Sequence, residues 1–291
     1  MPSQLSPLLI KPDLSQDEII HLTPDRAGWD LLNFAVRRLQ PGQQWTMETG
    51  DNELALVVLG GCCAVRTNRG EWPQIGHRPD VFSGMPYCLY LPRQTSVQVE
   101  ASLTGVELAY GWCATDQDHS PFLVNPQDVR VEIRGGGNAT RQINHMIPPG
   151  SPVHRIVVCE VFTPPGNWSS YAPHKHDQHR LDEQGKLVEA DLEEVYFYKI
   201  DRQGGFAYQR VYTADGSLDE LVLAGNNDLV LVPEGYHPVV SGHGYTTYYL
   251  NMLAGSAQSL AASDDPQYAW VKTEWTTRDP RLPIVHIGME E

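Results

Sequence analysis

The sequence predicts an all-β protein of two similar domains, and two observations carry this prediction. Short strand-like segments separated by glycine or proline recur about every ten residues from 45 to 114 and again from 153 to 253, a spacing typical of β-sandwiches and barrels. The two stretches also resemble each other. Between them, residues 134–152 are rich in glycine, proline and polar residues, which is the composition of a connector. We therefore expect an N-terminal domain over residues 1–140 and a C-terminal domain over residues 141–291.

The internal repeat consists of three pairs of matching segments that occur in the same order in both halves. They are residues 40–45 with 164–168, 52–57 with 193–198, and 90–92 with 231–233. A fixed order of matching segments indicates a duplicated structural unit. The sequence thus predicts two copies of one β-domain.

A pattern of histidines and a glutamate in the second half indicates a metal site. His174 and His176 are separated by one residue, Glu194 follows 18 positions after His176, and His237 ends the segment Pro233-Glu-Gly-Tyr-His237. Alternate residues of a strand face the same side, so the first two imidazoles lie side by side, and later strands can bring the other two groups to them. Three imidazoles and a carboxylate suit one divalent ion of zinc, manganese, iron, cobalt or nickel, and the sequence does not select among these metals.

The choice of carboxylate ligand lies between Glu193 and Glu194. We prefer Glu194 because the residues after it then place Tyr196 and Tyr198 on the metal-facing side of the strand. The first half has no counterpart of the His-x-His pair, and Ser96 occupies the position that corresponds to His237. The N-terminal domain is therefore expected to hold no metal and to complete the fold.

Composition limits the partners of the protein. The chain has 291 residues, a formal net charge of −15 and an isoelectric point near 5.1, which argues against nucleic acid and anionic membrane surfaces as partners. The five cysteines are odd in number and lie mostly in apolar runs, so we expect reduced thiols. The sequence has neither a signal peptide pattern nor a transmembrane run, so we expect a cytoplasmic protein. The expected partner is a small molecule, and the sequence leaves open whether the protein forms a homo-oligomer.

Longer strings give a more specific signal. They are Gly166-Asn-Trp-Ser-Ser-Tyr-Ala-Pro-His-Lys-His-Asp177, Leu192-Glu-Glu-Val-Tyr196, Gly205-Phe-Ala-Tyr-Gln-Arg-Val-Tyr212 and Val232-Pro-Glu-Gly-Tyr-His-Pro238. They resemble the 5-deoxy-glucuronate isomerases of inositol catabolism, which belong to the KduI/IolB type of bicupin. The resemblance implies two jelly-roll β-barrels of the cupin kind, with a divalent metal held by His174, His176, Glu194 and His237. It also implies an aldose–ketose isomerase that interconverts 5-deoxy-D-glucuronate and 5-dehydro-2-deoxy-D-gluconate.

Given that reaction, several side chains become candidates for catalysis. Tyr196 and Tyr249 could hydrogen-bond to the enediol oxygens, and Glu234 or a metal-bound hydroxide could carry the proton. The sequence leaves open whether hydrogen moves by a proton shuttle or by a hydride shift.

A uronate also needs partners for its carboxylate and hydroxyl groups. Arg210, which follows Gln209, is the first choice for the carboxylate and Arg155 the second, with Tyr236 as a further hydrogen-bonding group. Each of these assignments rests on residue type and on position near a predicted strand.

Three other functions fit the same pattern. The same ligands could serve a 4-deoxy-5-hexulose-uronate isomerase or an iron dioxygenase, because a redox-active iron with open positions binds oxygen. A non-enzymatic sugar-binding bicupin is the third alternative.

Overall fold

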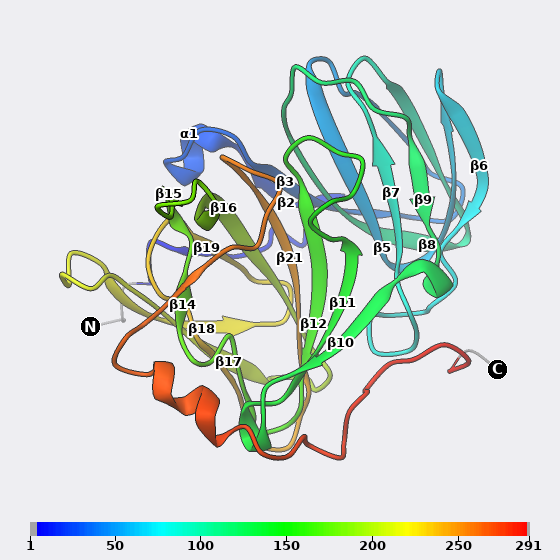
Figure 1. Cartoon of the computed structure of the whole chain (residues 1–291). Helices are drawn as coiled ribbons and strands as arrows, with labels where there is room; N and C mark the ends of the chain where they lie inside the picture. The colour runs from blue at the N-terminus through cyan, green and yellow to red at the C-terminus, as the bar shows by residue number, and fades with distance from the viewer. Residues whose placement is uncertain (1–4, 290–291) are drawn as a thin grey trace.

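The computed structural model describes residues 5–289 and confirms the predicted all-β class (Figure 1). Two large sheets of eight strands each form the two halves of the molecule, and a four-stranded sheet and a two-stranded sheet complete the C-terminal half. Helical segments are short: α1 (Pro24–Ala27) and the 3₁₀ turns Pro126–Asp128, Gly137–Ala139 and Ala269–Glu274. No helix in the described part of the chain is long and apolar enough to cross a membrane.

The N-terminal sheet is antiparallel. Its strands run in the order β2 (Glu18–Leu22), β3 (Asn33–Leu39), β8 (Ser96–Ala114), β5 (Asn52–Thr67), β7 (Tyr87–Leu91) and β9 (Phe122–Val124), with β4 (Gln44–Glu48) on β8 and β6 (Gly70–Ile75) on β5. Alternate residues of the long strand β5 enter two different cores. Leu54, Leu56 and Val58 pack inside the N-terminal domain, whereas Ala55 and Val57 join the large core shared with the other domain. This sheet is therefore buried on both faces along β5.

The C-terminal half contains the other three sheets. Its large sheet has the order β1 (Leu9–Ile10), β19 (Leu229–Val232), β16 (Leu187–Ile200), β21 (Thr247–Gly255), β12 (Val157–Thr163), β11 (Arg141–Ile147) and β10 (Arg130–Arg134), with β15 (Asp177–Leu181) on β16. The four-stranded sheet runs β13 (Trp168–Ser169), β20 (Val239–Ser241), β17 (Phe206–Tyr212) and β18 (Asp219–Gly225). The small sheet joins β14 (His174–Lys175) to β22 (Ser263–Asp264).

Sheet membership changes between β9 and β10. The strand β9 pairs with β7 in the N-terminal sheet, whereas β10 already pairs with β11 in the C-terminal sheet. Residues Leu9 and Ile10 also pair with β19 in the C-terminal sheet. The expected division at residue 140 therefore falls after the chain has entered the second sheet, and the start of the chain crosses to the second half as well.

The two domains hold each other through a matched pair of glutamates. Glu53 of β5 accepts hydrogen bonds of 2.6–3.0 Å from three successive backbone N–H groups, residues 154–156, just before β12. Glu193 of β16 accepts bonds of 2.6–3.0 Å from the N–H groups of residues 30–32, just before β3. Each domain thus holds the entry to a buried strand of the other domain, β12 or β3, and we call this arrangement the reciprocal glutamate clasp.

Strand register refines the internal repeat by one residue. Leu54 pairs with Leu91 in the first domain, and Glu194 pairs with Val232 in the second. Because Leu91 and Val232 correspond in the repeat, Glu194 corresponds to Leu54, and Glu193 corresponds to Glu53. A leucine therefore stands in the first domain where the second has the carboxylate of its histidine cluster.

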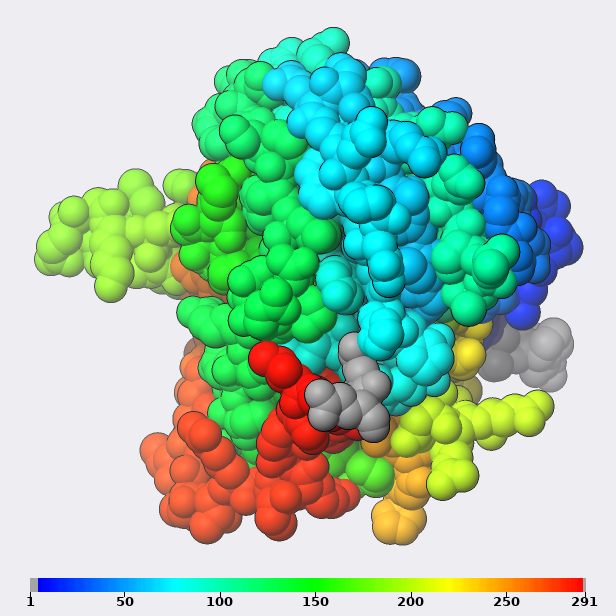
Figure 2. All heavy atoms as spheres, turned by 90° about the vertical axis from the view of Figure 1, so that its right-hand side faces the viewer, coloured from blue at the N-terminus to red at the C-terminus, as the bar shows by residue number. Residues whose placement is uncertain are grey.

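A buried ion pair also joins the halves. The guanidinium of Arg78 donates two hydrogen bonds, of 3.1 and 2.9 Å, to the carboxylate of Glu160 on β12, and both side chains are shielded from solvent. Seen from the side in Figure 2, the blue-to-cyan N-terminal residues pack directly against the green residues of the C-terminal half, and the orange-to-red C-terminal segment lies against the lower part of the same face.

Candidate metal centre

Three of the four predicted ligands come together as one buried cluster. His176 lies between β14 and β15, Glu194 on β16, and His237 in the turn after β19. Within residues 5–289 they form the one group of three whose ligand atoms all lie within 4.8 Å of one another. Glu194 Oε2 lies 2.9 Å from His176 Nε2 and 3.4 Å from His237 Nε2. We call these three residues the metal-ligand cluster.

Backbone carbonyls orient the two imidazoles of this cluster. His237 Nδ1 lies 2.9 Å from the carbonyl of Gly235, and His176 Nδ1 lies 3.2 Å from the carbonyl of Leu192. In both rings Nδ1–H is therefore the donor, and Nε2 is the ring nitrogen that faces Glu194. His237 Nε2 is buried and has no hydrogen-bond partner among the described residues. Two imidazoles that are held through Nδ1, each with Nε2 turned toward one carboxylate, fit a divalent cation.

His174 stands beside this cluster rather than inside it. Its ring centroid lies 4.8 Å from that of His237 and 6.3 Å from that of His176, and the side chain is half-buried on β14. Its ring nitrogens are not among the ligand atoms that lie within 4.8 Å of one another. The structure thus places the predicted fourth ligand next to the other three.

Burial sets the charge of these imidazoles in the protein without a cation. Removal from water lowers the pKa of His237 to about 4 and lowers the pKa of His174 well below its ordinary value. Burial acts in the same direction on His176, but the hydrogen bond and charge of Glu194 outweigh it and raise the pKa of that imidazole. His174 and His237 are therefore neutral near pH 7, as metal ligands must be.

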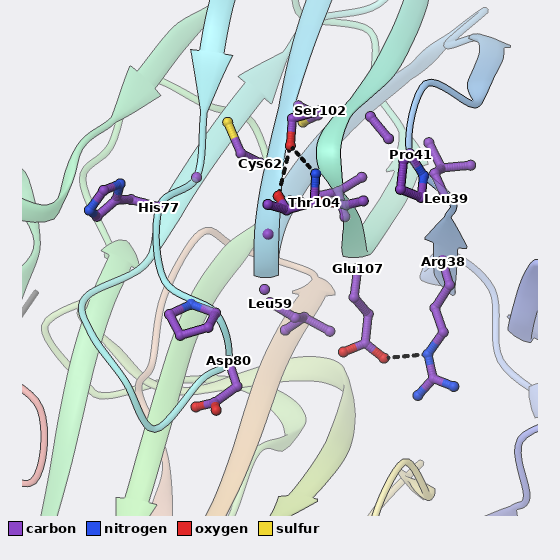
Figure 3. A pocket seen from close by; sticks show the side chains of 18 of the residues that line it. Arg38, Leu39, Pro41, Leu59, Cys62, His77, Asp80, Ser102, Thr104 and Glu107 are labelled. Carbon is purple, nitrogen blue, oxygen red and sulfur yellow. Dashed lines mark hydrogen bonds and ion pairs between the residues drawn. The ribbon is translucent and has the colours of Figure 1, made fainter.

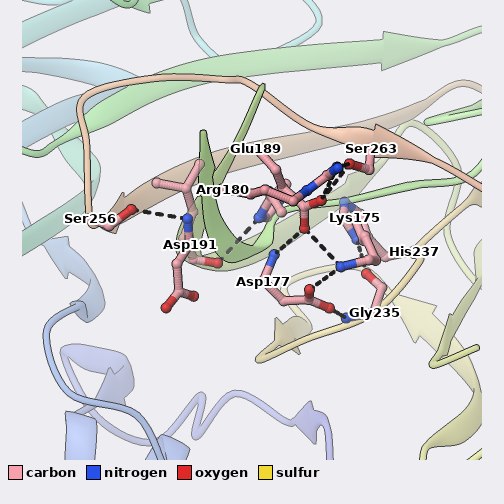
Figure 4. Close-up of polar contacts among 11 residues, drawn as sticks. Lys175, Asp177, Arg180, Glu189, Asp191, Gly235, His237, Ser256 and Ser263 are labelled. Carbon is pink, nitrogen blue, oxygen red and sulfur yellow. Dashed lines mark hydrogen bonds and ion pairs between the residues drawn. The ribbon is translucent and has the colours of Figure 1, made fainter. Parts of the chain in front are cut away.

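A polar network holds the turn that carries His237 (Figure 4). The N–H of Gly235 donates to Asp177 Oδ2 at 2.8 Å, and Lys175 Nζ bonds to both Asp177 and Glu189, the latter at 2.8 Å. Gly235 has a φ of +84°, and a Cβ there would lie 2.4 Å from a backbone oxygen, so a larger residue would displace the turn. The glycine of Pro233-Glu-Gly-Tyr-His237 is thus needed to position the histidine.

A cavity of about 250 Å³ opens beside the cluster. Tyr196 and Tyr249, two of the predicted catalytic residues, line it together with His174, His176 and Glu194. The volume suits a small molecule rather than a polymer.

The two cavity tyrosines contact a serine pair. Tyr249 donates a 3.0 Å hydrogen bond to Ser169 Oγ, and the Tyr196 hydroxyl lies 3.3 Å from Ser170 Oγ. Both serines come from the segment 168–170 that precedes the His-x-His pair, so the cavity wall and the ligands share one stretch of chain.

The third predicted catalytic residue, Glu234, lies elsewhere. Its side chain is exposed in the turn before His237 and does not line the cavity. Tyr236 from the same turn is buried against Tyr212, at 5.3 Å between ring centroids, and is also outside the cavity.

The other three residues predicted to bind the substrate are Arg210 and Gln209 on β17 and Arg155 just before β12. They also lie outside the cavity. Arg210 is exposed and donates two hydrogen bonds, of 2.7 and 2.8 Å, to Asp219. Gln209 is buried and accepts a hydrogen bond from Tyr198. The guanidinium of Arg155 donates to the carbonyl of Gly255.

Sequence reasoning missed the opposite wall of the cavity. Arg134, Arg141 and His145, from β10 and β11, line it together with Trp275 of the C-terminal segment. Arg134 and the whole of β11 lie in residues 134–152, which have the composition of a connector. The signal available was the alternation Arg141-x-Ile143-x-His145, which places three side chains on one face of a strand.

A larger, more open hollow is lined mainly by the N-terminal domain and also by residues 199–201 and 226 of the C-terminal domain (Figure 3). Its volume is about 1250 Å³, and its charged lining is largely paired, since Glu107 accepts hydrogen bonds from both Arg38 and Lys199. No metal-ligand group of the described residues lies in it. The chemistry-bearing side chains are therefore concentrated in the C-terminal domain.

Comparison with known proteins places this arrangement in a family. The sequence pattern of the KduI/IolB family matches residues 8–271. A 5-deoxy-glucuronate isomerase of Geobacillus thermodenitrificans is 43% identical over 257 residues, which cover 88% of this chain and 92% of that protein. The 5-deoxy-glucuronate isomerase of Bacillus subtilis is 34% identical over 87% of this chain and 93% of its own length.

Solved structures agree with the fold. An IolB-like protein of Salmonella typhimurium superposes with a TM-score of 0.86 at 35% identity and covers 91% of this chain and 98% of its own. A mutant of Bacillus subtilis oxalate decarboxylase superposes with a TM-score of 0.60 at 13% identity over 90% of this chain and 80% of its own, a likeness of fold alone. These likenesses confirm the predicted pair of jelly-roll cupin domains. With its sequence matched over most of its length, the chain belongs to the KduI/IolB family.

Proposed function

We propose that this chain is a metal-dependent 5-deoxy-glucuronate isomerase of inositol catabolism. It would interconvert the aldose 5-deoxy-D-glucuronate and the ketose 5-dehydro-2-deoxy-D-gluconate. The isomerases that are 43% identical to it support the reaction. The observation that carries the metal-dependent part is the buried cluster of His176, Glu194 and His237 beside a cavity of small-molecule size.

We propose that the cluster and the adjacent His174 hold one divalent ion. Both His176 and His237 turn Nε2 toward Glu194. The Nε2 atom of His237 has no hydrogen-bond partner among the described residues, and this supports the assignment. Such an ion would supply a Lewis acid that stabilises negative charge on the substrate carbonyl oxygen. Zinc, manganese, iron, cobalt and nickel all suit this donor set.

The remaining steps fall to side chains of the cavity. Tyr249 is buried, and burial raises the pKa of its hydroxyl, so near pH 7 it stays protonated and acts as a hydrogen-bond donor. Tyr196 lies 4.8 Å from it between ring centroids, on the side of the ligands. The two hydroxyls can donate to the oxygens on which charge develops when hydrogen moves between neighbouring carbons. Their serine partners would orient them for this role.

Proton NMR of the purified protein with a small set of substrates tests the reaction. We expect conversion of 5-deoxy-D-glucuronate to the ketose, and slower or no conversion of 4-deoxy-5-hexulose-uronate, without oxygen consumption. In heavy water, deuterium at the carbon next to the new carbonyl would identify a proton shuttle. No conversion of the first sugar, or oxygen uptake on its addition, would contradict the proposal.

A further inference from the structure

Arg141 is a buried cation that lacks a partner for part of its guanidinium. Its side chain is 5% exposed on β11 and lines the cavity beside the metal-ligand cluster. Its Nη1 atom is shielded from solvent and has no hydrogen-bond partner among the described residues. A buried charged group without a partner is costly, so such groups are normally paired.

Arg78 shows what a satisfied arginine looks like in this protein. It is buried, like Arg141, but both of its terminal nitrogens donate to the carboxylate of Glu160. That carboxylate outweighs burial and raises the pKa of Arg78, whereas burial dominates at Arg141 and lowers the pKa. Arg141 therefore lacks the carboxylate that Arg78 has.

Other unpartnered polar atoms lie around the same cavity. Nine buried side-chain nitrogen and oxygen atoms lack a partner in the described part of the chain, and four of them belong to this cavity or to the cluster beside it. They are Arg141 Nη1, His145 Nδ1, Trp275 Nε1 and His237 Nε2. His237 Nε2 suits a cation. The other three atoms indicate a ligand that brings its own hydrogen-bond donors and acceptors.

The chemistry of these three atoms defines that ligand. His145 Nε2 lies 3.0 Å from Glu132 Oε2, so it donates there and leaves Nδ1 as an acceptor. Trp275 Nε1 is a donor only, and the Arg141 guanidinium is a cationic donor. A carboxylate for the two donors and a hydroxyl for the imidazole would satisfy all three.

The other cations near the cavity are already engaged. Arg134 donates two hydrogen bonds, of 2.7 and 2.9 Å, to Glu132. Lys272 is exposed and lies 2.5 Å from Asp264. Arg141 is thus the cation of this wall with an unengaged, desolvated donor.

We propose that Arg141 binds the carboxylate of the sugar acid, with the indole N–H of Trp275 as a second donor and His145 as acceptor for a sugar hydroxyl. This inference rests on the proposed function. Glu194 lies on β16, Arg141 lies three strands away on β11, and both line the same cavity. A six-carbon uronate carries its reacting carbonyl at one end and its carboxylate at the other, so it can span the two walls.

This subsite selects against neutral sugars. A sugar that lacks the carboxylate would leave the Arg141 guanidinium buried and unpaired, and such a loss is rejected far more strongly than a change of size. Arg141 is therefore a residue that determines specificity for the charged end of the substrate.

The test compares a charged and a neutral substrate in matched variants. The wild type, Arg141→Gln and Arg141→Lys are assayed with 5-deoxy-D-glucuronate and with 5-deoxy-D-glucose, in which a hydroxymethyl group replaces the carboxylate. We expect Arg141→Gln to lower kcat/KM for the uronate by about 100-fold or more and to change that for the neutral sugar by less than about threefold. Arg141→Lys, which keeps the charge without the planar fork, should fall between. Arg66→Gln, an exposed arginine outside this cavity, is the control and should change neither value.

An equal fall of both kcat/KM values in Arg141→Gln, or no fall in either, would overturn the subsite. Circular dichroism and metal content of the variant should match the wild type. A binding titration with D-glucuronate and D-glucose separates this inference from the proposed reaction. If the wild type does not isomerise 5-deoxy-D-glucuronate, weaker binding of D-glucuronate to Arg141→Gln still supports the subsite. Equal affinity in the two proteins, or no binding to the wild type, contradicts it.

Discussion

Glu193 and Glu194 are consecutive residues of β16 whose carboxylates act on opposite sides of the strand. Glu193 accepts backbone N–H groups from residues 30–32 of the N-terminal domain, and Glu194 faces His176 and His237. The alternation of side chains along a strand separates the two roles, since one carboxylate supports the domain interface and the other supplies the cluster.

This pair yields a prediction with opposite outcomes at adjacent positions. Glu194→Gln should lose bound metal and at least about 100-fold of turnover, because replacing even an outer partner of a metal ligand costs 10–100-fold. Its unfolding free energy should change little relative to that of the metal-free wild type, because a bound ion stabilises only the protein that binds it. Glu193→Gln should keep metal and activity but lose about 1–3 kcal/mol of stability, because an amide accepts the three N–H groups less well. Metal analysis and urea unfolding check both variants. The reverse pattern would make Glu193 the ligand.

The second half of the reciprocal glutamate clasp should behave like the first. Glu53→Gln is expected to lower the unfolding free energy by about 1–3 kcal/mol, since Glu53 is fully buried and accepts three backbone N–H groups. If the two clasps act independently, the double variant Glu53→Gln/Glu193→Gln should lose the sum within about 0.5 kcal/mol. An unchanged urea midpoint in both single variants would show that the clasp does not stabilise the interface.

Breaking the Arg78–Glu160 pair should be one of the most damaging single changes in the interface. Arg78→Met leaves the carboxylate buried without its cation, which should cost about 3–5 kcal/mol. Arg78→Met/Glu160→Gln should cost less than the sum of the two single changes, because it removes the unpaired charge. Arg66→Met, which removes an exposed partner of Glu100, is the control and should cost less than about 1 kcal/mol. Equal losses in Arg78→Met and Arg66→Met would contradict this view of the interface.

The five thiols should differ in reactivity with pH. Burial raises the pKa of Cys63 and of Cys159 to about 12, so neither forms the reactive thiolate at pH 8, and reaction should rise only as the pH approaches that value. Cys62 is half-buried and its pKa is raised as well, so it should react slowly. We expect a disulfide reagent at pH 8 to titrate one thiol in the native protein and five after unfolding. Cys62→Ser should abolish the native reaction; rapid titration of several native thiols would contradict the burial.

Local patterns identified the cluster because strand alternation is a local rule. The His-x-His pair, the choice of Glu194 over Glu193 and the turn of Pro233-Glu-Gly-Tyr-His237 all follow from residue types and parity within one segment. The structure brings three of the four expected ligands, His176, Glu194 and His237, together and places His174 beside them.

The wall that faces the cluster could not be derived in the same way. Arg141 lies in a glycine- and proline-rich region, which becomes the buried strand β11 by pairing with β10 on one side and β12 on the other. Arg210 shows the complementary limit. Its neighbour Gln209 points into the core, so alternation turns Arg210 to solvent, and the sequence does not say which of two neighbours faces inward. The one-residue offset in the repeat has the same origin.

The most direct test of the central claim is the metal dependence of turnover. Metal content is measured on the purified wild type, and conversion of 5-deoxy-D-glucuronate is followed by proton NMR before chelation, after chelation, and after each candidate metal is returned. We expect about one ion per chain, loss of conversion when the ion is removed, and recovery of conversion when at least one of the five metals is returned. Glu194→Gln should neither bind the ion nor recover conversion. Full turnover in the thoroughly chelated protein would contradict a metal-dependent isomerase at this site.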